Sequence, residues 1–250
     1  MDHAKARKII RNFGSLTTGT TLGFACTFFL FVVISRFFGQ EGIGQYSFAM
    51  ALTSFFAAFS DFGLYNYSIK EVSRRTGTPD DGRGGIFMAR LILSVTALVA
   101  LLSMLLILPL SYETTMVIAL IGAYQVIQSL VNGFVAILVA HEDMHLSSLL
   151  EFSLRAVTAL VGVTVVMAGG NLVVTLATLP AISFGQLFVG YGIVTRRYGR
   201  PRLIAPWSSL RPTLRAAIPY ALSSFLYRLS ARVEIVLTGV FSRRRCGRGL

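Results

Sequence analysis

Charge is scarce in this sequence, and most of the charge that is present is positive. Charged residues make up 14% of the 250 residues, against about 25% in ordinary soluble domains. There are 23 lysines and arginines but only 11 acidic residues, so the formal net charge is +12. Together with 54% hydrophobic residues and a mean hydropathy of +0.68, this composition excludes an ordinary soluble domain and favours a membrane protein.

Cysteines and catalytic motifs are also scarce. Cys26 lies in an apolar stretch and Cys246 in the C-terminal tail, so they indicate no disulfide framework. The sequence has no HExxH, CxxC, nucleophile elbow or P-loop, and the glycine-rich run at 81–85 lacks the ending of a phosphate-binding loop. His141 and His145 have a spacing that could hold a metal on a helix, but a polar turn between helices is the simpler interpretation. No catalytic residue, metal or cofactor is therefore predicted.

Apolar stretches of membrane-spanning length recur along the chain. A bilayer core about 30 Å thick is crossed by roughly 20 helical residues, and between Arg11 and Arg36 alone there are 24 residues without a charge. The expected spans are Ser15–Ser35, Gly44–Leu64, Ile86–Leu110, Thr115–Ala140, a fifth from about Ser147 to Ala168, and Leu172–Val194. Gly169-Gly170-Asn171 is expected to form the turn between the last two. The sequence predicts an all-α, polytopic membrane protein.

The basic residues predict its orientation. Lys and Arg near span ends are retained in the cytoplasm. Fifteen of them lie before span 1, around the junction of spans 2 and 3, or after span 6, whereas the opposite gaps contain only Arg36. The N-terminus is therefore expected inside. A cleaved signal peptide is the alternative for span 1, but the apolar stretch is too long and Ile34-Ser35-Arg36 is a poor cleavage site.

The positive charge also raises the question of a partner. A net charge of +12 could suggest a nucleic-acid binder, but the basic residues are confined to segments that flank apolar helices. Retention in the cytoplasm and attraction to anionic lipid head groups explain that distribution. We expect the lipid bilayer, and no nucleic acid, as the partner.

Ionisable residues inside the spans are candidates for a site, because each is costly in lipid unless it faces a partner or water. Glu151 and Arg155 lie one helical turn apart in span 5 and can share a face. They are expected either to fix the bundle as a buried pair or to line a polar cavity. Asp61, at the inner end of span 2, is expected to be held by Lys70 or Arg74, with a gating or coupling role as the alternative.

Two small-scale patterns in spans 1 and 2 are expected to be structural. Gly19 and Gly23 have the Gly-x-x-x-Gly spacing that lets helix backbones approach closely. Phe55, Phe59 and Phe62 form a helical stripe, which is expected to face lipid or a packed neighbour.

A seventh apolar segment, residues 216–241, contains Arg228, Arg232 and Glu234. On a helix, Tyr220, Ser224 and the two arginines would form one polar stripe, which must face other helices or a wet cavity. The arginines would suit an anionic substrate, since guanidinium groups bind phosphate and carboxylate in a bidentate manner. Alternatively, they balance Glu234 and other carboxylates during packing.

Several motifs together resemble one transporter family. Residues 35–49 read SRFFGQEGIGQYSFA, which resembles the R-x-x-G-x-E-x-x-G-x-Y-x-x-A signature of bacterial polysaccharide flippases in the multidrug/oligosaccharidyl-lipid/polysaccharide exporter superfamily. Asp61-Phe62-Gly63-Leu64 resembles the D-F-G-L stretch of that family. The runs at 217–220 and 232–237 resemble the opening of its seventh helix. The match follows the chain in order over almost its whole length.

The resemblance implies a carrier, not an enzyme, in the bacterial cytoplasmic membrane. Its substrate would be an isoprenoid-pyrophosphate-linked oligosaccharide, moved from the inner to the outer leaflet through a central, often cationic cavity between two six-helix lobes. Arg228, Arg232, Glu234, Glu151, Arg155 and Asp61 are the candidates for that cavity. A drug or cation exporter of the same superfamily is the alternative, and would favour interior carboxylates and aromatic residues.

The chain departs from this family in its length. We expect a six-helix lobe over residues 1–195, a basic cytoplasmic linker over 196–215, a seventh helix over 216–241 that starts a second lobe, and an aberrant basic tail over 242–250. The tail, with four arginines, suggests a truncated or out-of-frame end. A second lobe or a second copy is then the expected partner, and a non-transporting membrane fragment is the remaining alternative.

Overall fold

The computed structural model describes residues 3–74, 83–199, 210–224 and 226. These residues are almost entirely helical and contain no strand. Six helices follow one another along the chain: α1 (His3–Asp61), α2 (Leu64–Arg74), α3 (Arg83–Ile107), α4 (Tyr112–Ala140), α5 (Met144–Met167) and α6 (Leu172–Tyr198). A further helical segment covers residues 210–224. The predicted all-α fold is confirmed.

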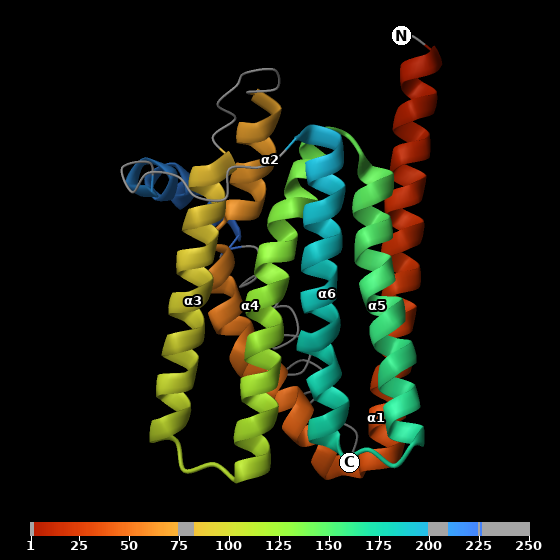
Figure 1. Ribbon diagram of the computed structural model, residues 1–250, viewed down its shortest axis with the longest axis vertical. Coiled ribbons are helices and arrows are strands. Elements are labelled where there is room, and N and C mark those ends of the chain that lie inside the picture. Colours follow the sequence, from red (N-terminus) through yellow and green to blue (C-terminus); the bar gives the residue numbers. More distant parts are fainter. Residues whose placement is uncertain (1–2, 75–82, 200–209, 225, 227–250) are drawn as a thin grey trace, which may run out of the picture.

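The first two predicted spans form two helical segments, together labelled α1, that meet at a sharp break. α1 has 59 residues, and Gly39 inside it adopts φ 64° and ψ −159°. This left-handed backbone is costly for residues with a Cβ and easy for glycine. Figure 1 shows the first half of α1 running from the N-terminal end of the bundle to the opposite end, and the second half running obliquely back toward α2. The two spans are therefore joined at Gly39, within the junction between their predicted bounds.

The turns at the far end of the bundle follow the sequence. Gly169 has φ 83°, and the Asn171 side chain accepts a hydrogen bond from the Val174 amide at 2.9 Å to cap α6. Ser111 caps α4 in the same manner, accepting from the Thr114 amide at 3.3 Å. Such caps satisfy amides that the first helical turn leaves unpaired. The predicted Gly-Gly-Asn turn is confirmed.

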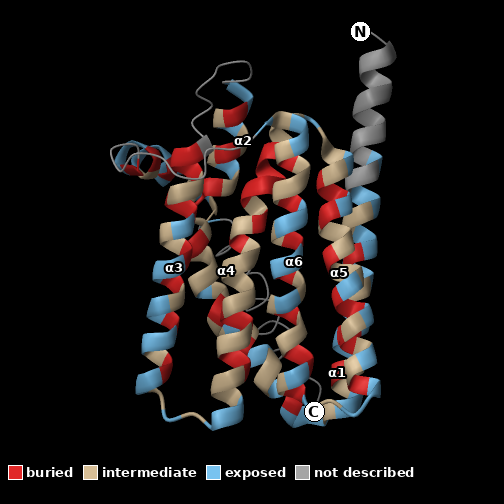
Figure 2. Cartoon of the chain, viewed as in Figure 1, coloured by how far each residue is buried: buried red, intermediate tan, exposed pale blue. Residues whose placement is uncertain are grey.

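Five helices of the described residues are long and apolar enough to cross a membrane. The first of them, Thr17–Arg74, contains the Gly39 break and thus both of the first two predicted spans. Large apolar side chains are exposed on these helices, among them Phe28 at 67% and Leu106 at 90%. Figure 2 shows buried residues where helices face one another and exposed ones on the outer faces. The chain is a multi-pass membrane protein.

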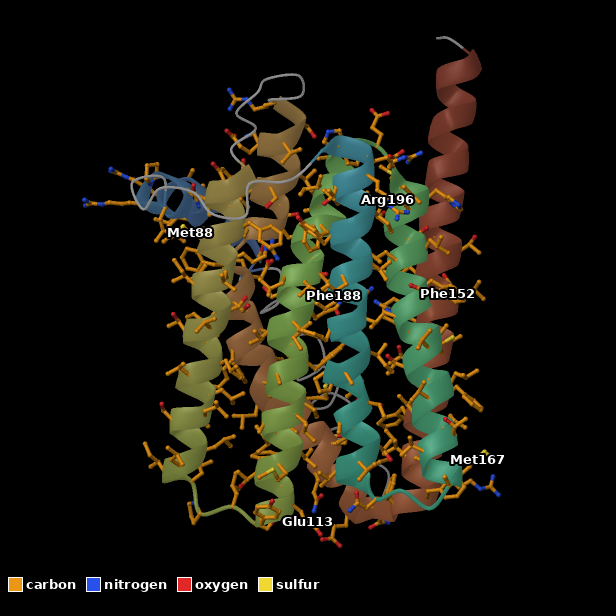
Figure 3. All side chains as sticks on the ribbon, viewed as in Figure 1. Met88, Glu113, Phe152, Met167, Phe188 and Arg196 are labelled. Atoms are coloured by element: carbon orange, nitrogen blue, oxygen red, sulfur yellow. The ribbon has the colours of Figure 1, made fainter. Side chains whose placement is uncertain are left out.

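The two ends of the bundle carry different side chains. In Figure 3, Arg196 lies at the end where α1 begins, whereas Glu113 and Met167 lie at the opposite end. Arg196 therefore lies at the end of the bundle that the basic residues are predicted to occupy. Arg90, which was counted among the basic residues near the span ends, instead lies within α3 and is fully buried.

Close helix contacts explain the small residues of α1. A methyl group added at Gly19 would lie 3.0 Å from Ser148 Cβ, and one at Gly23 would lie 2.7 Å from Arg155 Cδ. Both glycines therefore let α1 approach α5, as their spacing predicts. Further along, Leu30, Ile34 and Ala49 of α1 belong to the main apolar core with residues of α3, α4, α5 and α6.

Candidate substrate cavity

A polar cavity of about 600 Å³ opens between the helices of the bundle. Its described lining comes from the end of α1, from α2, α4 and α5, and from the segment 210–224: Ala57, Asp61, Tyr65, Asn66, Gln125, Gln128, Ser129, Asn132, Glu151, Ser223 and Ser224. Nearly all of these side chains are polar, although the helices that carry them are apolar. Polar groups at this depth must face one another or water, so the cavity is the natural candidate for a site.

One face of α4 supplies most of the polar wall. Gln125, Gln128, Ser129 and Asn132 are spaced i, i+3, i+4 and i+7, which places them on one side of a helix. Ser129 Oγ and Gln128 Oε1 are buried and have no hydrogen-bond partner among the described residues. Sequence reasoning concentrated on charged residues and missed this stripe. Its helical spacing inside an uncharged span was the available signal.

Two of the sequence-predicted residues, Asp61 and Glu151, lie on this cavity. They come from different helices, α1 and α5, and their sequence positions gave no sign that they would meet. No lysine or arginine belongs to the described lining of the cavity. The described wall is therefore acidic and amide-rich.

Arg155 lies elsewhere. Its guanidinium carbon is 4.6 Å from the centre of the Phe24 ring of α1, and its stem fills the space that Gly23 leaves open. A cation over an aromatic face is stabilised by the ring's charge distribution. Arg155 thus helps to join α5 to α1, and its charge still interacts with that of Glu151 on the cavity wall.

Asp61 pairs with Arg90, and not with Lys70 or Arg74. Arg90 Nη1 lies 3.4 Å from Asp61 Oδ1, and the exposed fractions of the two side chains are 0% and 19%. The same Nη1 donates a 2.7 Å hydrogen bond to the Ser129 carbonyl. The predicted partners of Asp61 were wrong because they were chosen as the basic residues nearest to it in the sequence. In the fold, α3 packs against α1 and α4, and this packing brings Arg90 next to Asp61.

The D-F-G-L stretch forms a tight turn at the end of α1. Phe62 has φ 41° and Gly63 has φ 69°, and the chain then re-enters a helix at Leu64. A methyl group at Gly63 would lie 2.3 Å from the amide nitrogen of Ala221 and 2.5 Å from the carbonyl carbon of Tyr220. Glycine is therefore required twice, by its backbone angle and by the segment 210–224 that packs on it.

This double requirement makes Gly63→Ala a sharp test of the packing. Gly39→Ala is the matched control, because Gly39 has a similar φ of 64° but open space around it. We expect Gly39→Ala to cost about 1–3 kcal/mol of backbone strain, because its φ and ψ angles lie in a region almost exclusive to glycine. Gly63→Ala should cost more, because a clash with backbone atoms of Tyr220 and Ala221 is added to its strain. Thermal unfolding of both variants in detergent measures the difference. Equal melting temperatures would contradict the close approach of the segment 210–224.

Side chains reinforce the same contact. The Tyr220 ring lies 6.0 Å from the Tyr67 ring, and Lys70 Nζ is 5.6 Å from the centre of the Tyr220 ring. Leu210, Leu214 and Ala217 join an apolar cluster with Leu64 and Ala89. Residues 210–215, which precede the predicted start of the seventh helix, are already helical in this segment.

An apolar pocket of about 320 Å³ adjoins the polar cavity. Its lining shares Asp61 and Ser224 with the cavity and is otherwise apolar: Phe55, Ala58, Phe59, Phe62, Gly63, Ile218, Ala221 and Leu222. The predicted phenylalanine stripe of span 2 therefore lines a pocket opposite the segment 210–224. Asp61 stands where the polar and the apolar spaces meet.

The remaining candidates lie outside the cavity or outside the described residues. Arg228, Arg232 and Glu234 belong to the second group. His141 Nδ1 is hydrogen-bonded to the Ile137 carbonyl at 2.9 Å, and its ring stacks 4.0 Å from that of Tyr198. In the part of the chain that the structure describes, no group of three His, Cys, Asp or Glu side chains could hold a metal ion.

Comparison with known proteins shows the family of this chain. The sequence matches the family described as polysaccharide biosynthesis protein over residues 9–245. The chain belongs to this family. A comparison with curated proteins finds no match.

Two solved transporter structures have the same fold. One is an outward-facing multidrug resistance MATE family transporter of the MOP superfamily, with a TM-score of 0.64 and 18% identity. The other is a MOP superfamily transporter from Pyrococcus furiosus, described as having a binding pocket of reverse polarity, with a TM-score of 0.62 and 18% identity. Each comparison covers 87% of this chain and 52% of the solved one. The chain thus spans about half the length of these transporters.

Proposed function

We propose that this chain forms one lobe of a carrier that moves a lipid-linked oligosaccharide, or a related polysaccharide precursor, across the cytoplasmic membrane of a bacterium. The single observation that carries the proposal is the polar cavity of about 600 Å³ within apolar helices. A sugar is rich in hydroxyl groups, and the amides and hydroxyls of α4 offer them hydrogen bonds at a depth where lipid offers none. The family to which the chain belongs supports the same class of substrate.

The neighbouring apolar pocket supports a substrate with two chemical halves. An isoprenoid-linked sugar carries a polar head and an apolar tail, and the cavity and the pocket meet at Asp61 and Ser224. The proposal includes a second lobe, because the solved transporters are about twice as long as the chain described here. Carriers built from such paired lobes bind substrate between them. No covalent chemistry is required.

In this proposal the N-terminus lies in the cytoplasm. Arg196 and the start of α1 share one end of the bundle, and basic residues are retained on that side. After Glu142, at the same end, a reporter enzyme that works only in the cytoplasm should be active when fused to the chain. After Gly169, a reporter that works only outside the cytoplasm should be active. The reverse result would overturn the orientation.

Transport is tested with the purified chain in liposomes. We expect a fluorescent lipid-linked oligosaccharide to cross these membranes faster than it crosses empty liposomes, with the chain alone or with a co-reconstituted second lobe. Flux no greater than in empty liposomes under both conditions would remove the proposal. The assay reports directly on translocation because only the outer leaflet is accessible to a membrane-impermeant quencher.

Export of a cationic compound is the second candidate. It is favoured by Asp61 and Glu151, the two carboxylates of the described cavity wall, and by the absence of Lys and Arg from its described lining. Oppositely charged groups attract strongly in such a low-dielectric site. In the same liposomes, flux of a cationic dye without flux of the lipid-linked sugar would favour this candidate.

A further inference from the structure

The helical segment 210–224 presents two arginines that no described residue neutralises. Arg211 and Arg215 are exposed, and neither forms a hydrogen bond or an ion pair with the described residues. Their spacing of four residues places both on one side of the helix. The segment itself contains no acidic residue that could balance them. Their charge is therefore available to a partner outside the described part of the chain.

The same side of the segment continues with apolar residues. Ile218 and Leu222 follow Arg215 at i+3 and i+7, so they lie in line with the two arginines along the helix. Ile218 is 52% exposed and Leu222 is 59% exposed. We call these four residues, Arg211, Arg215, Ile218 and Leu222, the exposed stripe. One half of the exposed stripe is cationic and the other half is apolar.

Packing on another side of the helix decides where the exposed stripe lies. Leu210, Leu214 and Ala217 form an apolar cluster with Leu64 of α2 and Ala89 of α3. Figure 1 shows the segment (blue) lying across α3, near the end of the bundle where α1 begins. The basic residues predict that this end lies in the cytoplasm. The exposed stripe is thus outside the packed cluster and near the cytoplasmic boundary of the bilayer.

We propose that the exposed stripe binds an anionic phospholipid of the cytoplasmic leaflet. The lipid phosphate lies between Arg211 and Arg215, because guanidinium groups form bidentate bonds to phosphate. An acyl chain lies along Ile218 and Leu222. Helices in the membrane interface combine basic and apolar residues in this way, and charge complementarity favours an anionic lipid over a zwitterionic one. This inference goes beyond the proposed function, since such a lipid is bound whether or not a substrate is transported.

A phospholipid in this position would contact a segment that also forms walls of the candidate site. Ser223 and Ser224 line the polar cavity, whereas Ile218 and Leu222 line the apolar pocket. The apolar pocket is then open to an acyl chain of the bilayer as well as to the tail of a substrate. No residue of the exposed stripe belongs to the described lining of the polar cavity, so the phospholipid leaves that space to the substrate.

The single tryptophan of the sequence, Trp207, offers a probe for lipid beside the segment. It precedes Leu210 by three residues, which span at most about 11 Å of extended chain. The purified full chain is placed in nanodiscs that contain increasing fractions of phosphatidylglycerol or phosphatidylcholine with brominated acyl chains, which quench tryptophan fluorescence. We expect half-maximal quenching at about a tenfold lower fraction of the brominated phosphatidylglycerol, because each arginine adds a several-fold preference for an anionic lipid.

Substitutions of the arginines locate the origin of that preference. Arg211→Gln/Arg215→Gln should remove it, whereas Arg211→Lys/Arg215→Lys keeps both charges and should retain most of it. The matched control is Arg74→Gln/Arg196→Gln, which removes the same charge from exposed positions outside the stripe and should leave the preference unchanged. An unchanged preference in Arg211→Gln/Arg215→Gln, or an equal loss in the control, would overturn the proposal.

Two other results of the quenching experiment would also overturn it. Loss of the preference when inorganic phosphate is added would mean that the arginines hold a soluble anion. Absence of quenching by either brominated lipid would mean that protein, such as a second lobe, covers the exposed stripe. Native mass spectrometry gives a measurement that is independent of Trp207: the natural chain should retain more phosphatidylglycerol than Arg211→Gln/Arg215→Gln, and equal retention would contradict the proposal.

Discussion

Arg90→Met is expected to destabilise the bundle by about 3 kcal/mol, the usual cost of breaking a buried ion pair by removing one partner. Arg90 joins three helices, since it lies on α3, contacts Asp61 at the end of α1 and bonds the Ser129 carbonyl of α4. Removing the guanidinium leaves the mostly buried Asp61 carboxylate without its counter-charge. Thermal and denaturant unfolding in detergent micelles measures the loss.

Two further variants define the origin of that loss. Arg90→Met/Asp61→Leu removes both charges and should recover most of the stability, because replacing both members of a buried pair is far less costly than replacing one. Arg197→Met breaks the exposed pair with Asp143 and should cost less than about 1 kcal/mol. If the double variant were as unstable as Arg90→Met, the ion pair would not be the source of the stability.

Gln128→Leu is expected to reduce transport of the lipid-linked sugar at least tenfold while leaving the fold intact. Gln128 lines the polar cavity, and its Oε1 atom is buried without a partner among the described residues. Leucine removes a group that can bond a sugar hydroxyl, and a lost hydrogen bond inside a low-dielectric site costs about 1–3 kcal/mol. The measurement is the initial flux in liposomes, normalised to the amount of folded protein.

Gln40→Leu is the control for this change. It makes the same substitution at an exposed position beside the Gly39 break, away from the cavity. We expect its flux to equal that of the natural chain. Equal losses for the two variants, or full activity of Gln128→Leu, would contradict the assignment of the cavity as the path of the sugar.

Much of the fold could be predicted from the sequence because the bilayer restricts what can form. Uncharged stretches of about 20 residues must become helices, since only helices and closed barrels satisfy the backbone in lipid. The Gly-Gly-Asn turn and the Gly19 and Gly23 contacts also follow from local chemistry. The break at Gly39 was harder to predict, because two helices joined by one non-helical glycine and two helices joined by a short loop have similar sequences.

The candidate site was only partly predictable. Asp61 and Glu151 were selected as charges inside spans, and the structure places both on one cavity. Arg155 was selected by the same rule yet packs on Phe24, because helical spacing tells which residues share a face but not which neighbour that face meets. Arg90 was assigned to the charges near the span ends for the same reason. The contacts of these residues depend on which distant helices pack together. Periodicity within one helix carries no information about that packing.

The central claim is that a water-accessible polar cavity lies within the membrane-embedded helices, and cysteine labelling tests it most directly. In a chain whose Cys26 and Cys246 are replaced by serine, Gln128→Cys places a thiol on the cavity wall, and Leu160→Cys places one on an exposed apolar position of α5. The account predicts that, in membranes, a charged, water-soluble thiol reagent labels the Gln128→Cys variant and leaves the Leu160→Cys variant unlabelled. Labelling of neither variant, or of the two equally, would contradict it.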